Sequence, residues 1–129
     1  MKIGIDLDNT IIDYSESFIE GVRYLKFKLP KSIETKEEIK RFLIKKNRSH
    51  WHQLQGIVYS KFLLSHGKLY PGVKSFLLRC KAKGHKVIVI SHKSKKAHHQ
   101  SSDINLRKIA EKWLILKKIF NTNESLIQK

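Results

Sequence analysis

The sequence predicts an α/β fold: a parallel sheet with a small helical cap inserted after its first strand. Two short apolar runs rich in β-branched residues, residues 3–7 and 86–91, are typical of buried parallel strands. The second run directly follows a helical segment and a glycine turn, which together form the back half of a parallel α/β unit. Residues 14–69 separate the first strand from this unit, whereas a crossover needs only about a dozen residues. The excess length predicts an inserted cap.

The length and composition are those of one globular domain. The chain has 129 residues, 40% of them hydrophobic and 29% charged, which is enough to bury a core. We expect a single domain over residues 1–129, with the core in residues 1–13 and 70–129 and the cap in residues 14–69. The lone cysteine, Cys80, excludes an internal disulfide and favours the reducing cytoplasm.

No apolar run approaches the roughly 18 residues needed to span a bilayer, so we expect no membrane association. The early apolar stretch is interrupted by Asp6 and Asp8, which argues against a signal peptide. The formal net charge of +16 favours phosphorylated ligands or nucleic acid as partners. The lysines, however, are spread over every segment, and no basic block is interleaved with aromatic residues. A small phosphorylated substrate is therefore favoured over nucleic acid, and an unselected lysine-rich surface remains an alternative.

Within the cap, the spacing of apolar residues predicts three helices. The first covers residues 14–29, with Ser15 as the residue that caps the amino end of the helix and Pro30 at its carboxyl end. The second begins at a capping box formed by Thr35 and Glu38. The third covers residues 51–64. We expect these helices to form a lid over the site, although an ordinary helical packing layer is the alternative.

Beyond the cap, residues 73–83 read as a helix with Cys80 in the core, and Gly84 supplies the left-handed stop. After the strand at residues 86–91 comes a polar loop, and a further helix is expected to begin at Ser102 or Asp103 and to end near Lys118. The last six residues are too short to assign. These elements together predict a Rossmann-like α/β domain.

Asp6 and Asp8 end the first strand, and chemistry in open α/β sheets occurs just beyond the carboxyl ends of such strands. Residues two apart in an extended chain share a face, so the two carboxylates are expected side by side. Two carboxylates this close repel one another unless a cation joins them or one is protonated. Mg²⁺ prefers oxygen ligands of this kind, so we predict that Asp6 and Asp8 hold magnesium.

Three motifs in this order resemble those of the haloacid-dehalogenase-like hydrolases. Residues 6–10, Asp-Leu-Asp-Asn-Thr, match the D-x-D-x-T motif of this superfamily, and residues 87–91 resemble its second motif, an apolar strand ending in Ser or Thr. Tyr70-Pro71-Gly72 followed by a helix resembles the approach to that second strand. The resemblance implies phosphatase chemistry, since the second aspartate of the first motif is typical of the phosphatases in the superfamily.

The resemblance also implies roles for individual residues. Asp6 would be the nucleophile, forming an aspartyl-phosphate, and Asp8 the general acid and base. Ser91 would donate a hydrogen bond to a phosphoryl oxygen, and Thr10 would fix the geometry of the first loop. His92 is not part of this resemblance, but its place beside Ser91 makes it a candidate substrate contact, with a simple loop residue as the alternative.

The third motif, a lysine, and the fourth, an acidic pair ending a further strand, are not found in the sequence. Lys93 is the candidate that would stand in for the missing lysine as a charge partner. The sequence thus predicts a magnesium-dependent phosphomonoester hydrolase for a small phosphorylated metabolite, such as a sugar phosphate or a nucleotide. The alternative is a non-catalytic or truncated module of the same fold that binds phosphate groups or nucleic acid.

Overall fold

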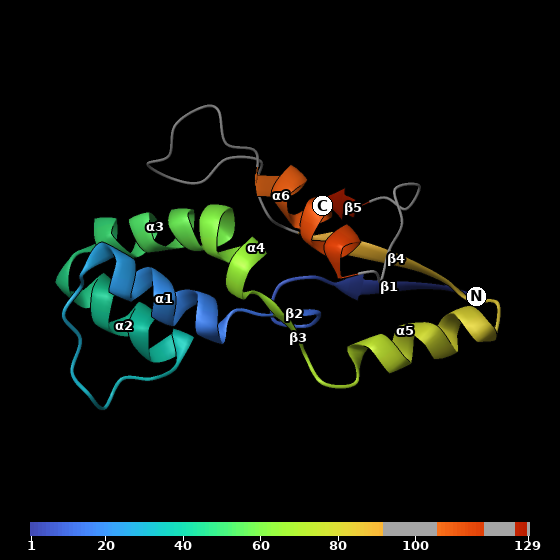
Figure 1. The fold of residues 1–129 in the computed structure, drawn as a ribbon, viewed down its shortest axis with the longest axis horizontal. Coiled ribbons are helices and arrows are strands. Elements are labelled where there is room, and N and C mark those ends of the chain that lie inside the picture. Colours follow the sequence, from blue (N-terminus) through green and yellow to red (C-terminus); the bar gives the residue numbers. More distant parts are fainter. Residues whose placement is uncertain (92–105, 118–125, 129) are drawn as a thin grey trace.

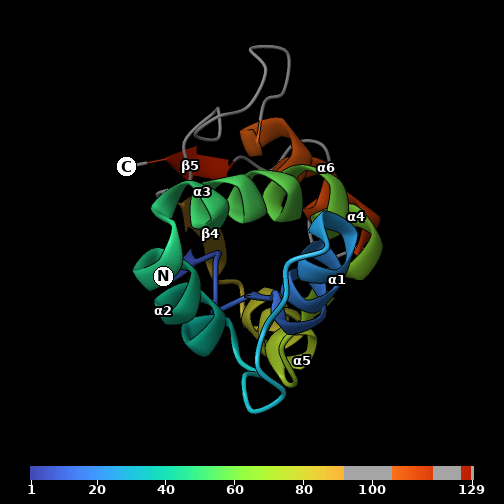
Figure 2. The same ribbon diagram turned by 90° about the vertical axis from the view of Figure 1, so that its left-hand side faces the viewer.

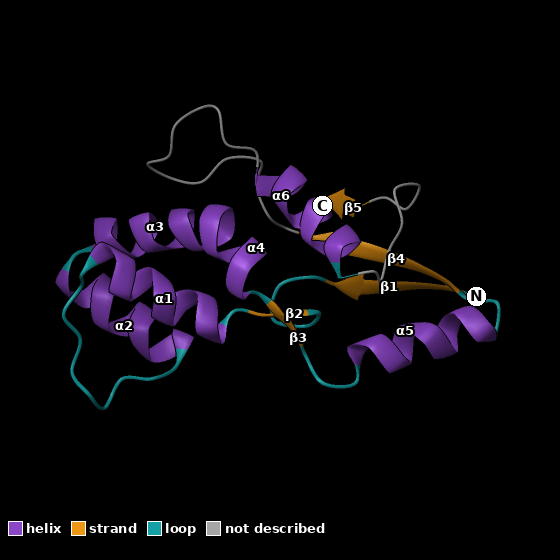
Figure 3. Ribbon diagram, viewed as in Figure 1, coloured by secondary structure: helices purple, strands orange, loops and turns teal. Residues whose placement is uncertain are grey.

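The computed structural model describes residues 1–91, 106–117 and 126–128, which form a mixed α/β fold (Figure 3). Its main sheet is parallel, with the strand order β1-β4-β5. The strands are β1 (Lys2–Asp6), β4 (Lys86–Ser91) and β5 (Leu126–Gln128). The predicted α/β class and the parallel pairing of the two apolar runs are therefore confirmed.

β5 is a strand that the sequence analysis did not assign. It pairs with the carboxyl half of β4, from Val89 opposite Leu126 to Ser91 opposite Gln128. Three residues are too few to show the alternation that marks a strand in sequence. Only its pairing with β4 identifies β5.

The cap consists of four α-helices and one π-helical segment between β2 and β3. These elements are α1 (Ser15–Leu25), α2 (Lys36–Lys46), α3 (Arg48–Ile57), η1 (Val58–Phe62) and α4 (Leu63–His66). β2 (Ile12–Asp13) and β3 (Lys68–Leu69) pair antiparallel, so the chain leaves and re-enters the core through a short two-stranded ribbon. Figure 1 shows the cap helices at one end of the molecule, with the ribbon between them and the sheet.

Local capping decides where the cap helices begin and end. The predicted capping box is confirmed: the Thr35 hydroxyl accepts a hydrogen bond from the Glu38 amide at 3.2 Å, and the Glu38 carboxylate accepts one from the Thr35 amide at 3.1 Å. The predicted end of the first helix at Pro30 is wrong. α1 ends at Leu25 because Lys26 adopts a left-handed conformation (φ 58°) and its amide bonds back to the last turn. The third helix begins earlier than predicted because the Asn47 side chain caps it.

In the α/β core, α5 (Val73–Ala82) matches the predicted helix, and Gly84 has the expected left-handed conformation (φ 76°). α6 (Leu106–Leu116) lies within the last predicted helix, whose expected starting residues lie outside the described part. Figure 2 shows α5 and α6 on the same side of β4 and β5, and Figure 1 shows α6 beside β4 and β5 and α5 beyond β1. Among the described residues, no helix combines the length and hydropathy needed to cross a membrane.

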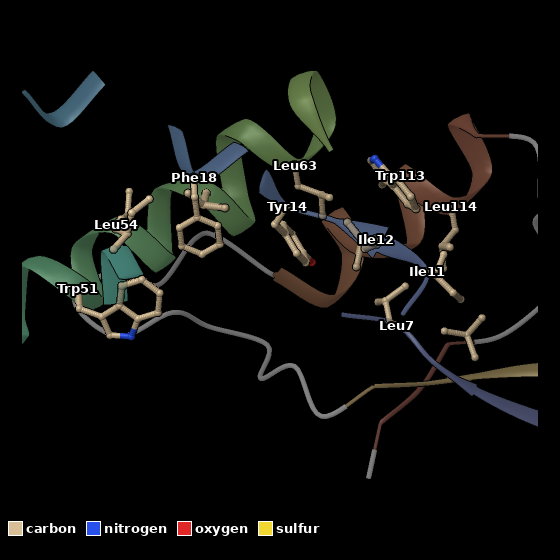
Figure 4. Close-up of a cluster of buried hydrophobic side chains, with 14 of the residues drawn as sticks. Leu7, Ile11, Ile12, Tyr14, Phe18, Trp51, Leu54, Leu63, Trp113 and Leu114 are labelled. Carbon is tan, nitrogen blue, oxygen red and sulfur yellow. The ribbon is translucent and has the colours of Figure 1, made fainter. Parts of the chain in front are cut away.

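The buried side chains form one hydrophobic cluster that extends from the sheet into the cap (Figure 4). Val89 lies at its sheet end and Leu54 at its cap end. Leu7 and Ile12 lie between them, where the chain passes from β1 into the ribbon. The cap is therefore packed onto the core through a shared interior.

Trp113 of α6 fixes the return of the cap to the core. Its indole is fully buried, and Nε1 donates a hydrogen bond to the carbonyl oxygen of Gly67 at 3.2 Å. Gly67 follows α4 and leaves no space for a side chain. A Cβ atom there would lie 2.6 Å from the Leu63 carbonyl oxygen and 2.9 Å from Trp113 Nε1.

We predict that Gly67→Ala lowers the free energy of unfolding by about 1–3 kcal/mol, because backbone and indole must both move to admit the methyl group. Urea unfolding followed by circular dichroism measures this change. Ser65→Ala, at an exposed position two residues earlier, is the matched control and should leave stability nearly unchanged. Equal stability of the two variants would contradict the close packing at Gly67.

Candidate functional site

Asp6 is the last residue of β1, and its side chain is exposed. It lies opposite Ile90 of β4 in the parallel register. The carboxylate therefore stands at the carboxyl edge of the sheet, where open α/β folds bind their ligands. This is the location that the sequence predicted for it.

The chain turns tightly after Asp6. The carbonyl oxygen of Leu7 accepts hydrogen bonds from the amides of Ile11 at 2.9 Å and Ile12 at 3.0 Å. Asn9 has a left-handed conformation (φ 64°), and Thr10 is exposed on the turn. Because the regular strand ends at Asp6, the alternation that predicted Asp6 and Asp8 side by side does not extend through this turn.

Asp8 is directed toward the cap. Its Oδ1 atom accepts a hydrogen bond from the Tyr14 hydroxyl at 2.5 Å. Tyr14 immediately precedes α1, and only 1% of its surface is exposed. Burial raises the pKa of Tyr14 well above its usual value, and the charge of Asp8 and this hydrogen bond act in the same direction. The phenol is thus kept protonated as a donor to the Asp8 carboxylate.

Tyr59 belongs to the same group of side chains. Its ring meets the Tyr14 ring edge-on, with 5.1 Å between centroids. Burial, followed by the charge of Asp8, raises the pKa of Tyr59 to about 12. Tyr59 lies in η1, the π-helical segment, and π-helical turns are frequent at functional sites. Periodicity alone does not reveal a π-helical turn, so the sequence analysis missed Tyr59. It missed Tyr14 because the bond from Tyr14 to Asp8 depends on the turn after β1.

Lys36, the first residue of α2, approaches the same group from the other side of the cap. Its ammonium nitrogen is 5.7 Å from the centroid of the Tyr14 ring and 5.3 Å from that of Phe18. Partial burial lowers the pKa of Lys36, while the nearby charge of Asp8 opposes this effect. In the part of the chain that the structure describes, Lys36 forms no salt bridge.

A hollow of about 200 Å³ lies next to this group, between the turn after β1 and the start of α2. Its lining is mostly polar and consists of Asn9, Asp13, Tyr14, Ser15, Glu34, Thr35, Lys36, Glu37 and Tyr70. One of its carboxylates is already engaged, since Asp13 accepts hydrogen bonds from the amide and the hydroxyl of Ser15. The hollow can accommodate a small polar group next to Tyr14 and Lys36.

Ser91 is the last residue of β4, and 1% of its surface is exposed. Side chains alternate along a strand, and residues paired in a parallel ladder share a face. Because Asp6 is paired with Ile90, the side chains of Asp6 and Ser91 leave the sheet on opposite faces. The register thus brings the two strand ends together at one edge but separates the side chains of Asp6 and Ser91, which the resemblance to the phosphatases placed around one phosphoryl group. His92 and Lys93, the other predicted substrate contacts, lie outside the described residues.

The carboxylates of Asp6 and Asp8 are of the ligand type that Mg²⁺ prefers. Among the described residues, no group of three or more His, Cys, Asp or Glu side chains forms a larger ligand set. Mg²⁺ commonly uses one or two protein carboxylates and completes its octahedron with water and substrate oxygens. The two carboxylates of the turn after β1 thus match magnesium in the chemistry of their oxygen atoms alone.

No family model matches the chain, and no curated protein matches it.

The raised pKa of Tyr59 predicts how stability depends on pH. The folded protein favours the neutral phenol, so this stabilisation is complete below the ordinary tyrosine pKa of 10.0 and is lost as the pH rises toward about 12. We expect Tyr59 to account for about 2–3 kcal/mol of that loss. In Tyr59→Phe, the decrease in the free energy of unfolding between pH 9 and pH 12 should be smaller by this amount.

Tyr24→Phe is the matched control, because the Tyr24 side chain is 52% exposed. Urea unfolding at a series of alkaline pH values, with tyrosinate absorbance recorded in parallel, measures the effect. The burial of Tyr59 would be contradicted if the two variants lost stability equally.

Proposed function

We propose that the chain is a magnesium-dependent phosphomonoester hydrolase of the haloacid-dehalogenase type, with a Rossmann-like core and a helical cap. The observation that carries the proposal is the position of Asp6, exposed at the carboxyl end of a parallel strand and followed at once by Asp8 in a tight turn. An exposed carboxylate at this position can reach a phosphoryl group and act as its nucleophile.

In the proposed reaction, an Asp6 carboxylate oxygen attacks the phosphorus atom and the bond to the ester oxygen breaks. Asp8 takes up a proton from solvent before this step and gives it to the departing oxygen, leaving an aspartyl-phosphate on Asp6. Asp8, now a carboxylate, takes a proton from water, whose oxygen attacks phosphorus and releases inorganic phosphate and Asp6. The hydrogen bond from Tyr14 holds Oδ1 and so orients the Asp8 carboxylate during both proton transfers.

Asp6 and Asp8 would hold magnesium, which supplies positive charge beside the anionic carboxylate and phosphate. Thr10 and the amides of the turn would keep the loop in shape, because the Thr10 amide already bonds back to the Leu7 carbonyl at 3.4 Å. We propose a small phosphorylated metabolite as substrate. The hollow beside Tyr14 has room for only a small group, which fits the rest of a small substrate.

A phosphate- or nucleic-acid-binding module without turnover is the second candidate, and the net charge of +16 favours it. Such a module would bind DNA or RNA with an affinity that falls steeply with salt, and it would not release phosphate from an ester. A measurement of phosphate release from an ester therefore separates the two candidates.

We predict that the chain releases phosphate from para-nitrophenyl phosphate in the presence of magnesium and that chelation of the metal abolishes this activity. Asp6→Asn should remove the activity, because an amide is a poor nucleophile. Asp8→Asn should lower kcat by about 10²–10⁴-fold, the range expected for loss of general acid–base catalysis.

Glu20→Gln is the matched control. It removes a carboxylate of α1 that does not line the hollow, and it should keep the wild-type activity. Activity that survives Asp6→Asn would refute the proposed nucleophile.

A further inference from the structure

A phosphate group at the proposed site needs a positive charge from the protein. This inference rests on the proposed function, in which a phosphoryl group meets two carboxylates, Asp6 and Asp8. Anionic substrates and carboxylates repel one another, so such sites combine a metal ion with basic side chains. The structure places one such side chain, Lys36, over the ring of Tyr14, whose hydroxyl donates to Asp8.

Lys36 is held in place by its surroundings. The capping box of Thr35 and Glu38 fixes the first turn of α2, and Lys36 is the first helical residue. Figure 1 shows this end of α2 on the side of the cap that faces the ribbon. The ammonium group lies over the rings of Tyr14 and Phe18, at a distance typical of cation–π contacts. The Tyr14 ring thus has Lys36 over its face and Asp8 at its hydroxyl.

This placement of Lys36 is unfavourable for the helix alone. The amino end of a helix carries partial positive charge, so acidic residues are favoured there and cations are not. Partial burial makes the charged form still less favourable. A half-buried lysine at a helix N-terminus violates a local rule of stability, and such violations are expected at functional sites.

We propose that Lys36 binds the phosphate group of the substrate, so that the cap supplies the cationic residue of the phosphoryl site. Its ammonium and the amino end of α2 present positive charge on the side of Asp8 that faces the cap. Lys36 would then have the role that the sequence assigned to Lys93.

The charge of the neighbouring hollow limits where the phosphate can lie. Asp13, Glu34 and Glu37 border the hollow together with Lys36. Three carboxylates disfavour an anion inside it, so the phosphate is placed between Lys36 and Asp8. The hollow then receives the rest of the substrate, which we expect to be neutral or cationic.

The test compares three variants in the full chain with magnesium present. Lys36→Met keeps an unbranched side chain over the aromatic rings and removes the charge, and Lys36→Arg keeps the charge. The matched control is Lys40→Met, because Lys40 lies one turn further along α2 and also covers an aromatic ring, that of Trp51 at 5.9 Å. Two quantities are measured: the affinity for inorganic phosphate, by phosphorus NMR titration, and KM and kcat for para-nitrophenyl phosphate.

We expect Lys36→Met to weaken phosphate binding and to raise KM by about 10- to 100-fold, the range of a lost hydrogen bond to a charged group. Lys36→Arg should restore most of the affinity, and Lys40→Met should bind as the wild type does. Thermal unfolding of Lys36→Met should occur at or above the wild-type temperature, because the substitution removes an unfavourably placed charge.

The outcomes also separate this proposal from the proposed function. Wild-type affinity and KM in Lys36→Met would overturn the role of Lys36 and leave the hydrolase intact. Phosphate binding that depends on Lys36 in a chain without turnover would support the role of Lys36 and refute the hydrolase. A wild-type chain that neither binds phosphate nor hydrolyses the ester would overturn both.

Discussion

The arrangement of this protein depends on a single hydrophobic interior shared by the sheet and the cap. The turn after β1 contributes Leu7 and Ile11, the entrance to α1 contributes Tyr14 and Phe18, and α6 contributes Trp113 (Figure 4). All of these side chains are at most 1% exposed. Because they pack against one another, the cap cannot change its orientation without opening the core. Side chains of the cap are therefore held at fixed positions relative to the carboxylates at the sheet edge.

Tyr14 shows how this shared interior reaches the proposed chemistry. Its ring packs against Phe18 and Tyr59, while its hydroxyl donates to Asp8. One residue thus belongs both to the core and to the site, so that packing of the cap directly sets the orientation of an acid at the end of the sheet. A buried tyrosine normally needs a partner for its hydroxyl, and here the partner is the acid proposed to transfer protons.

Features encoded within a few residues could be predicted from the sequence. The capping box at Thr35 depends on local contacts, and it was predicted correctly. The same holds for the unit in which α5 ends at a left-handed Gly84 and β4 follows. The position of Asp6 at a strand end followed from the same kind of reasoning.

Features that depend on distant partners could not be predicted in this way. Asp8 bonds to Tyr14 because the chain turns at Leu7, and the face from which Ser91 leaves the sheet depends on the register between β1 and β4. The left-handed conformation of Lys26 has no signal in its residue type.

The hydrogen bond from Trp113 to the Gly67 carbonyl oxygen links α6 to the inserted helices between β2 and β3. This link affects whether those helices could be deleted from the chain. A shortened chain that joined Ile12 directly to Leu69 would keep the parallel strands but remove the helices that cover Trp113 and Ala110. An apolar surface uncovered in this way favours association between copies and aggregation. Deleting the insertion would therefore require simultaneous replacement of apolar residues on α6, which makes the helical region an integral part of this domain rather than an exchangeable module.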